Sequence, residues 1–367
     1  MKCGEIIDVI EKLAPKELAE SWDNIGLQIG NLDDEVKRIL VTLDVTEKVV
    51  DEAVEKNINM IISHHPLIFK GLSNITMDGS KGKIIKSLIK NDINLYISHT
   101  NMDIAQGGLN DMLAKKLKLQ NIKVLSPSIF EKLYKLAVFV PEGYEDQVRD
   151  VLGNAQAGWI GNYSHCTFQS KGIGTFKPME GADPFIGKVD DIEKVDEYRI
   201  ETIVSQKNLS NAINKMIEVH PYEEVAYDVY PLEIRGSESG LGRIGELEDS
   251  MDYETFIEMA KGVLNIDILR IAGSKKDYIK KVGLCTGSGA DFMMDAARAG
   301  VDVYITGDVK YHEAQMAEEL NILLIDGGHF STEIIFIDGV KDYLDKEIDK
   351  DIEVIESKVN KDVFRIQ

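Results

Sequence analysis

Cysteine and long hydrophobic runs are both scarce in this chain. Only three cysteines, Cys3, Cys166 and Cys285, occur in 367 residues, and they are far apart. An odd number of scattered thiols argues against a disulfide framework and for a reducing compartment. No stretch approaches the roughly 20 apolar residues that a membrane-spanning helix needs, and the first residues lead into an amphipathic segment without a cleavage signal. We therefore expect a cytoplasmic protein with no membrane segment.

Positive charge is scarce as well. The chain has 42 lysines and arginines against 63 aspartates and glutamates, which gives a net charge of -21. Such a chain would repel a nucleic acid backbone, and no basic stripe offsets the repulsion, so we expect no nucleic acid partner. A small anionic substrate such as a nucleotide is still compatible with this charge, because bound divalent cations would make the site locally positive.

Histidine is also infrequent, but its placement is not random. Four of the seven histidines fall in three short clusters, which are His64-His65-Pro66, His99 to Asp103 and His329 to Glu333. Each cluster directly follows an apolar run typical of a buried strand, and these runs are 59–63, 93–98 and 321–326. Residues just past the carboxyl ends of parallel strands lie along one edge of a sheet. We therefore expect the three clusters to meet at such an edge.

The residue types in these clusters predict a metal site. Imidazole and carboxylate groups together suit zinc, manganese or iron, and a bridging carboxylate allows two cations to lie close together. His329 and Glu333 are four residues apart at an expected helix start, so their side chains should converge. Any one of these residues alone is explained equally well as a loop cap. The full set predicts two divalent metal ions, with zinc favoured over manganese or iron; the expected ligands are His64, His65, Asp103, His329 and Glu333.

Six motifs in a fixed order carry a resemblance to a known family. They are ESWDNIG at 20–26, SHHP at 63–66, SHTNMD at 98–103, CTGSGAD at 285–291, TGDVKYHEA at 306–314 and DGGHFSTE at 326–333. With them the chain resembles the dinuclear-metal-centre family named after NGG-interacting factor three, whose bacterial members are called GTP cyclohydrolase I type 2 homologues. The resemblance implies the same five metal ligands, with none missing, and self-association as a homohexamer.

Two separate parts of the chain alternate strand and helix patterns. The expected strands are 38–44, 59–63, 93–98, 282–285, 301–305, 322–325 and 352–356, and the expected helices are 47–56, 81–90, 109–119, 249–264, 291–298, 311–320 and 332–344. This alternation is typical of an α/β fold with parallel strands and helices on the sheet faces. Because ligands come from both parts, we expect one composite three-layer α/β core domain, formed by 1–125 and 233–367.

The intervening segment, 126–232, has a different pattern. Strand-like runs at 134–140, 165–169 and 225–230 alternate with helical patterns at 144–152 and 209–219. This order predicts an inserted α+β ferredoxin-like domain, and the segments 158–163, 180–185 and 220–224 resemble the PII/CutA-like insert of longer family members. Such inserts trimerise and bind small regulators, so this one is expected to serve oligomer packing or regulation. His220 with Glu223 and Glu224 could bind a metal, although a histidine before proline more often caps a turn.

The predicted function is metal-dependent hydrolysis of a nucleotide or a related small substrate. If the family name holds literally, the guanine ring of GTP is opened with loss of formate. The general acid or base is unassigned, and His99 and His312 are the candidates. Asp44 and Asp308, like these two histidines, could either orient a metal ligand or bind substrate directly, whereas Asp23 is expected to shape a turn. Two alternatives stay open: a non-enzymatic metal-binding or regulatory scaffold, and a metal-dependent phosphoesterase.

Overall fold

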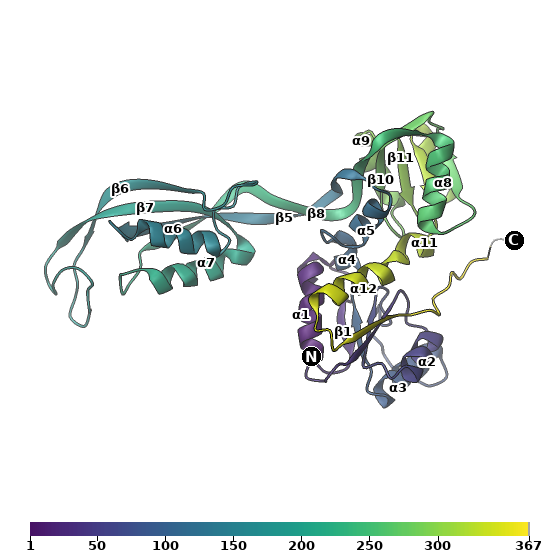
Figure 1. Cartoon of the computed structure of the whole chain (residues 1–367), viewed down its shortest axis with the longest axis horizontal. Helices are drawn as coiled ribbons and strands as arrows, with labels where there is room; N and C mark the ends of the chain where they lie inside the picture. Colours follow the sequence, from purple (N-terminus) through teal and green to yellow (C-terminus); the bar gives the residue numbers. More distant parts are fainter. Residues whose placement is uncertain (366–367) are drawn as a thin grey trace. The chain divides into compact units, whose positions relative to one another are not determined.

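The computed structural model describes residues 1–365 and divides the chain into two compact units. The first unit joins Met1–Ile129 to Ser239–Gln367, and the second is Phe130–Glu238. These divisions fall a few residues later than the expected 125/126 and 232/233, because the long strands β5 (Gln120–Pro141) and β8 (Tyr227–Asp252) continue through those points. The mixed α/β class is confirmed (Figure 1). No helix within residues 1–365 is both long and apolar enough to cross a membrane.

A five-stranded sheet carries the first two histidine clusters. Its strand order is β1 (Gly26–Ile29), β4 (Asn94–Ile97), β3 (Met60–Ser63), β2 (Arg38–Thr42) and β13 (Glu353–Glu356). All neighbours are parallel except β1, which runs antiparallel to β4. The register pairs Thr42 with Ser63 and Ser63 with Ile97, so β2, β3 and β4 end level. The residues that follow these three strands therefore lie along one sheet edge.

The third cluster follows a strand of another sheet. Within the first unit this sheet has the order β8, β10 (Tyr278–Leu284), β11 (Val303–Thr306), β12 (Leu323–Asp326) and β9 (Arg270–Gly273). Strands β10, β11 and β12 are parallel and are flanked by antiparallel partners, β8 and β9. The antiparallel strands β1 and β9 are edge strands, β1 beside β4 in the first sheet and β9 beside β12 in this one. The parallel strands of the first unit thus belong to two separate sheets. The expectation that all clusters lie at one edge of one sheet was therefore wrong.

Helices of the first unit cover both sheets and share one core with them. Helix α1 (Cys3–Leu13), α5 (Leu109–Lys116), α8 (Tyr253–Leu264) and α12 (Ile335–Glu347) pack with residues of both sheets, whereas α2 (Glu47–Glu55) and α3 (Ser80–Lys90) belong to a second cluster. Helices α9 (Met293–Arg298) and α10 (Tyr311–Glu319) follow β10 and β11. Helix α8 was expected to begin at Asp249. It begins at Tyr253 because β8 continues to Asp252, whose side chain accepts a hydrogen bond from the Thr255 amide and caps the helix.

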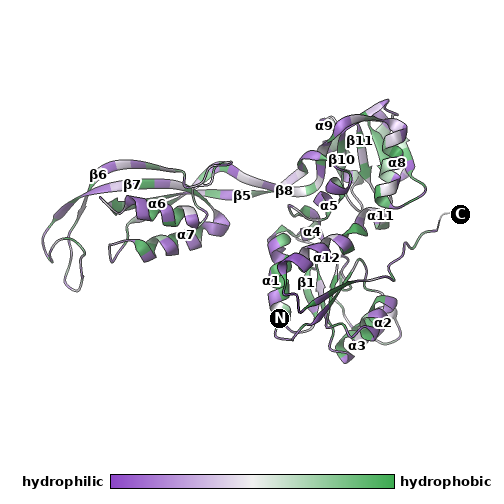
Figure 2. Cartoon of the chain, in the orientation of Figure 1, coloured by the Kyte–Doolittle hydropathy of each residue, from purple (hydrophilic) through white to green (hydrophobic). Residues whose placement is uncertain are grey.

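The second unit is built in the order β5, α6 (Glu145–Asn154), β6 (Thr167–Phe176), β7 (Glu193–Ser205), α7 (Gln206–Val219) and β8. Its strands lie in the order β6, β7, β5 and β8, and both helices cover one face of the sheet (Figure 1). Leu136, Val138 and Ile200 pack there against Val148 of α6 and Met216 of α7. Hydrophobic and hydrophilic residues alternate along both helices (Figure 2). The PII/CutA-like character of this unit stays a prediction.

Candidate metal centre

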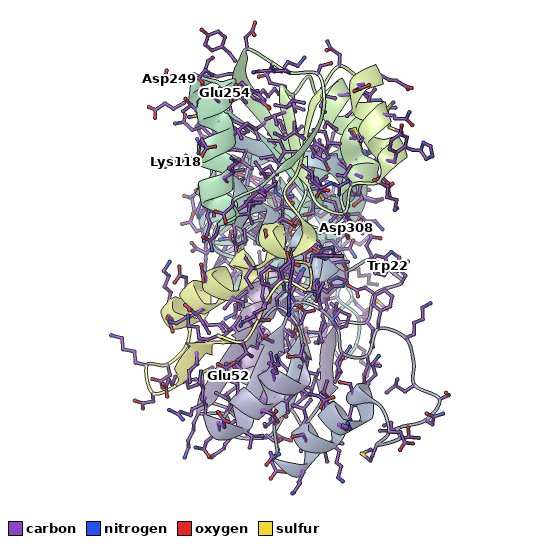
Figure 3. The ribbon with its side chains drawn as sticks, turned by 90° about the vertical axis from the view of Figure 1, so that its right-hand side faces the viewer. Trp22, Glu52, Lys118, Asp249, Glu254 and Asp308 are labelled. Atoms are coloured by element: carbon purple, nitrogen blue, oxygen red, sulfur yellow. The ribbon has the colours of Figure 1, made fainter. Side chains whose placement is uncertain are left out.

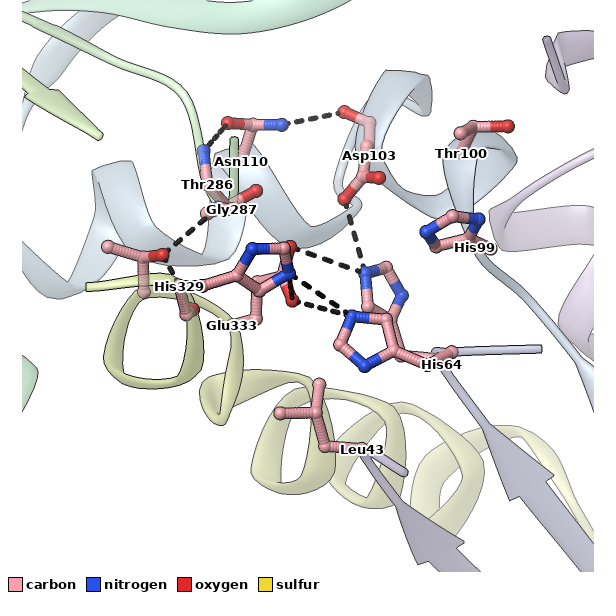
Figure 4. Close-up of polar contacts among 12 residues, drawn as sticks. Leu43, His64, His99, Thr100, Asp103, Asn110, Thr286, Gly287, His329 and Glu333 are labelled. Atoms are coloured by element: carbon pink, nitrogen blue, oxygen red, sulfur yellow. Dashed lines mark hydrogen bonds and ion pairs between the residues drawn. The ribbon is translucent and has the colours of Figure 1, made fainter. Parts of the chain in front are cut away.

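The three histidine clusters come together in the first unit. His64 and His65 directly follow β3, and Asp103 lies in the short helix α4 (Thr100–Ile104) after β4. His329 and Glu333 are the first and last residues of α11 (His329–Glu333), which follows β12 (Figure 4). All five expected ligands therefore belong to one cluster, and the two sheets supply different members of it.

Glu333 is at the middle of this cluster. Its Oε2 atom lies 2.9 Å from Nε2 of His65 and 3.0 Å from Nε2 of His329. Its Oε1 atom lies 3.8 Å from Nε2 of His64, which is also 3.7 Å from Oδ1 of Asp103. The two carboxylate oxygens of Glu333 thus face different histidines.

A hydrogen bond to Nδ1 orients every histidine ring of the cluster. The acceptors are Asp44 for His65 at 2.8 Å, Asp308 for His329 at 2.7 Å, the Ser98 carbonyl for His64 at 3.0 Å and Asp23 for His99 at 3.0 Å. A carboxylate or carbonyl can only accept, so Nδ1 carries a proton and Nε2 is the atom that faces the centre, where it could bind a metal. This is the arrangement that metal-binding histidines usually have.

Asp308 and Asp23 each hold Nδ1 of one histidine. Asp308 lies beside the turn of α11 (Figure 3), as expected for a residue that positions a ligand. Asp23 was expected only to shape a turn, but its carboxylate accepts hydrogen bonds from His99 and from the Thr100 amide and hydroxyl. Burial raises the pKa of Asp23, yet these hydrogen bonds outweigh it and lower the pKa to about 2. Asp23 therefore remains a carboxylate that holds His99 in place.

The polar atoms of the cluster fit a metal. Within residues 1–365, Nε2 of His64 and Oδ1 of Asp103 are buried and have no hydrogen-bond partner. Buried polar atoms without a partner are rare, because leaving one unsatisfied costs about 1–3 kcal/mol. Two sets, His64 with His65 and His99, and His65 with His329 and Glu333, each bring one ligand atom per residue within 4.8 Å of the others. An imidazole and carboxylate donor set of this kind suits zinc, manganese or iron.

Without a cation, protons supply the positive charge of the cluster. Burial lowers the pKa of His65, but its hydrogen bonds to Asp44 and Glu333 outweigh burial and raise the pKa to about 10. The hydrogen bond to Glu333 raises the pKa of His329 to about 9. Burial opposes the charge of Glu333 too, yet hydrogen bonds from the histidines hold the pKa of Glu333 well below its usual range. A cation bound here would replace these protons.

Two loops approach the cluster closely because they carry glycine. Gly287, from the segment after β10, has a φ of +61°, and a Cβ there would lie 2.1 Å from Oε1 of Glu333. A Cβ on Gly307, after β11, would lie 2.7 Å from the backbone nitrogen of His329. Asn110 links Asp103 to the loop that carries Gly287. It donates to the Asp103 carbonyl at 3.0 Å and accepts from the Thr286 amide at 2.9 Å (Figure 4). The glycines of the CTGSGAD and TGDVKYHEA motifs thus serve the same centre.

Comparison with known proteins agrees with this geometry. The model of the Duf34/NIF3 (NGG1p interacting factor 3) family matches residues 1–363. The chain belongs to this family. A "GTP cyclohydrolase 1 type 2 homolog" of Halalkalibacterium halodurans is 47% identical over 362 residues, covering 98% of this chain and 97% of the relative. The protein of the same name from Bacillus subtilis is 47% identical over 331 residues, covering 90% and 89%.

Solved structures of family members show the same fold. A Bacillus cereus protein related to NIF3 superposes with a TM-score of 0.92 at 44% identity, and the match covers 100% of this chain and 99% of that one. The Staphylococcus aureus protein SA1388 superposes with a TM-score of 0.78 at 34% identity, with coverage of 100% and 99%. The resemblance deduced from the six motifs is thus confirmed for the whole chain.

A cavity of about 730 Å³ opens beside the candidate metal ligands of this family member. His65 and His329 form part of its wall, and Arg270 and Lys361 are its basic residues. The apolar part of the lining consists of Leu43, Ile266, Ile268, Val309, Phe330, Val363 and Phe364. Pockets for small molecules commonly have about 300–1,000 Å³ and this mixture of apolar walls with a few polar groups.

The two candidates for a general acid or base are placed differently. The His99 ring lies 5.1 Å from the His64 ring and 5.8 Å from the His65 ring, centroid to centroid, so it borders the cluster. His312 is on the exposed surface of α10, where its Nδ1 contacts Gln315 at 2.9 Å. His312 lines neither the cluster nor the cavity. The structure therefore brings His99 to the site and leaves His312 outside it.

Proposed function

We propose that the protein is a hydrolase that holds two divalent metal ions and acts on a nucleotide or a related small anionic substrate. The observation that carries this proposal is the placement of Glu333, whose two oxygens face different histidine nitrogens. His65 and His329 with Oε2 of Glu333 would hold one ion. His64 and Asp103 with Oε1 of Glu333 would hold the other. Zinc is the favoured metal, with manganese and iron as alternatives.

The residues of the chain prepare the site for such ions. Bound divalent cations supply an activated water and positive charge for an oxyanion that develops on the substrate. Asp44 and Asp308 hold the Nδ1 protons of His65 and His329, and thereby keep both Nε2 atoms available as ligands. Their role is orientation, and neither reaches the substrate through this contact.

His99 is the candidate for proton transfer. No residue among 1–365 forms a hydrogen bond with its Nε2 atom, while Asp23 holds its Nδ1 atom with both carboxylate oxygens at 3.0 Å. Because Asp23 stays ionised, it would stabilise the imidazolium that forms when His99 accepts a proton. A histidine oriented by a buried carboxylate is a recurrent arrangement for general acid–base catalysis.

The cavity supports a small anionic substrate. Its apolar wall can cover a planar ring, and Arg270 and Lys361 can meet phosphate oxygens. Four aspartates also line the cavity, which are Asp44, Asp308, Asp326 and Asp362, so an anionic substrate would depend on the bound cations for most of the positive charge that it meets. Arg270 also pairs with Asp326 at 2.8 Å, so its guanidinium is held beside β12. Since relatives at 47% identity are called GTP cyclohydrolase 1 type 2 homologs, GTP is the substrate to test first.

The first experiment measures metal content and turnover in the same samples. The protein is stripped of metal, loaded in turn with zinc, manganese or iron, and its bound metal is counted by mass spectrometry. Each form is then incubated with GTP, and formate, ring-opened product and free phosphate are followed. We expect about two ions per chain and formate release, both of which Glu333→Gln should abolish.

Two histidine variants separate catalysis from metal binding. His99→Asn should keep the metal but lower turnover by about 10²–10⁴-fold, the range typical of a lost general acid or base. His312→Asn is the matched control, because His312 is exposed on α10, and it should change neither quantity. If GTP stays intact with every metal at full occupancy, the result would contradict hydrolysis of GTP and favour a non-enzymatic metal-binding scaffold. Phosphate without formate would favour a phosphoesterase.

Light scattering tests the predicted homohexamer.

A further inference from the structure

The second unit contains a cavity of its own, of about 490 Å³. Four aromatic rings line it, from Phe139, Phe176, Phe185 and Tyr222. The ring centroid of Tyr222 lies 5.8 Å from that of Phe176 and 6.3 Å from that of Phe185. The segments 180–185 and 220–224, which the metal centre does not use, supply part of this wall. The cavity lies on the face of β5 and β7 opposite to α6 and α7, because side chains alternate along a strand and Val138 and Ile200 point to the helices.

A buried carboxylate belongs to this aromatic wall. Glu197 of β7 is only 7% exposed, and its Oε1 atom accepts a hydrogen bond from the Tyr222 hydroxyl at 2.8 Å. Burial and this hydrogen bond raise the pKa of Tyr222, so its hydroxyl remains a donor. Within residues 1–365 no lysine, arginine or histidine forms an ion pair with Glu197. The basic residue in the lining, Lys177, pairs instead with Asp190 at 3.2 Å.

The backbone around this carboxylate leaves space for it. A Cβ on Gly174 of β6 would lie 2.1 Å from Oε2 of Glu197, so any larger residue would displace the carboxylate. His220 fixes the loop that carries Tyr222, since its Nε2 lies 3.0 Å from the Phe139 carbonyl and its Nδ1 accepts from the Tyr222 amide at 3.1 Å. Both ring nitrogens are therefore occupied, and His220 is a structural residue here rather than the metal ligand considered above.

The chemistry of the wall selects the class of ligand. A buried carboxylate without a cationic partner is costly, because burial removes its hydration. Glu197, Glu223 and Glu224 all line the cavity and would repel an anion. A hydrated metal ion needs several oxygen ligands, which the apolar remainder does not offer. An organic cation satisfies both the carboxylate and the aromatic rings, whose faces attract positive charge.

We propose that this cavity binds an organic ammonium ion, a primary or methylated amine on a short apolar stem. The ammonium group pairs with Glu197, and the stem packs against Phe176 and Phe185. The same group could arrive as a free amine or as the side chain of a lysine in a peptide. The volume of about 490 Å³ suits a free small molecule.

Calorimetric titration of the full-length protein tests this site. Three probes carry an ammonium group: choline, butylamine, and a tripeptide that is acetylated at its N-terminus and has a free lysine side chain. The fourth probe is 3,3-dimethylbutan-1-ol, the uncharged carbon analogue of choline. We expect one binding site per chain for choline or butylamine and binding about 10- to 30-fold weaker for the uncharged analogue. Glu197→Gln keeps the shape of the side chain and should weaken amine binding at least about tenfold. Glu218→Gln, an exposed glutamate on α7, is the matched control and should change nothing.

A thermal-shift measurement protects the test against a misfolded variant. Glu197→Gln removes an unpaired buried charge, so its melting temperature without ligand should equal or exceed that of the natural protein. The amine should raise the melting temperature of the natural protein and not that of the variant. Equal affinity for choline and its uncharged analogue, or unchanged affinity in Glu197→Gln, would overturn the proposal. Binding of the tripeptide alone would assign the ammonium to a peptide partner, and no binding of any probe would reject the site.

Discussion

Gly287→Ala is predicted to damage the metal centre without unfolding the protein. Gly287 has a φ of +61°, a conformation in which an alanine costs about 1–2 kcal/mol. The added Cβ would also lie 2.1 Å from Oε1 of Glu333, whereas real Cβ contacts below 3.0 Å are essentially never seen. Glu333 would therefore have to move by about 1 Å, and displacements of that size can cost a site about 10²-fold in function.

Gly300→Ala separates the two effects. Gly300 has a similar φ of +68°, but a Cβ there meets nothing within 4 Å. Both variants should lose about 1–2 kcal/mol of stability, which corresponds to a fall of about 2–8 °C in the melting temperature measured with a chelator. Only Gly287→Ala should also bind metal at least about tenfold more weakly. Equal metal affinity in the two variants would refute the argument that Gly287 makes room for the Glu333 carboxylate.

Three further predictions concern other parts of the first unit. Asp308→Asn should weaken metal binding about 10- to 100-fold, because a neutral amide replaces the carboxylate that holds Nδ1 of His329. Unchanged metal affinity would contradict this. In metal-free protein the pKa values of His65 and His329, about 10 and about 9, exceed the unfolded value of about 6.5. Their stabilising contribution is therefore complete below about pH 6.5 and is lost as the pH rises through 9 to 10. The melting temperature of chelator-treated protein should fall progressively between about pH 6.5 and 10. A melting temperature that does not change with pH would contradict these raised pKa values. Asp111→Asn should lower the free energy of unfolding in urea by about 3–5 kcal/mol. The reason is that the Arg243 guanidinium, which is 3% exposed, loses the carboxylate that it contacts at 3.0 Å. A change below about 1 kcal/mol would argue against a strong ion pair.

Local patterns predicted the strands and the meeting of the three histidine clusters (Figure 4); the metal-ligand role of their residues stays a prediction. The apolar runs before His64, His99 and His329 are buried strands. Each strand ends where a polar cluster follows, so the end of the strand could be read from the sequence. The ligand set was recognisable because histidine is rare here and its placement follows those runs. The convergence of His329 and Glu333 needed only helical geometry, since the two residues are one turn apart.

The remaining features depend on contacts between distant segments. The edge strands β1 and β9 have only four residues each, and no local pattern indicates that they pair antiparallel at the edges of two separate sheets. The role of Asp23 depends on a contact with His99, 76 residues away. The start of α8 was misplaced because Met251 and Asp252 pair with β10, and pairing overrode the helical pattern. These features belong to the tertiary structure, which the spacing of residues does not encode.

The way the chain leaves and re-enters the first unit has a consequence for engineering. A Cβ on Gly240 would lie 2.0 Å from the Ser126 carbonyl, so the outgoing and returning strands touch where the second unit begins. All five candidate ligands belong to the first unit. We therefore expect their positions not to depend on the number of residues between Ser126 and Gly240. Because the entropy of closing a loop changes by only about 0.6 kcal/mol for each doubling of its length, this junction is a natural place to delete, exchange or insert a whole module, and a short turn there should leave the geometry of the centre intact.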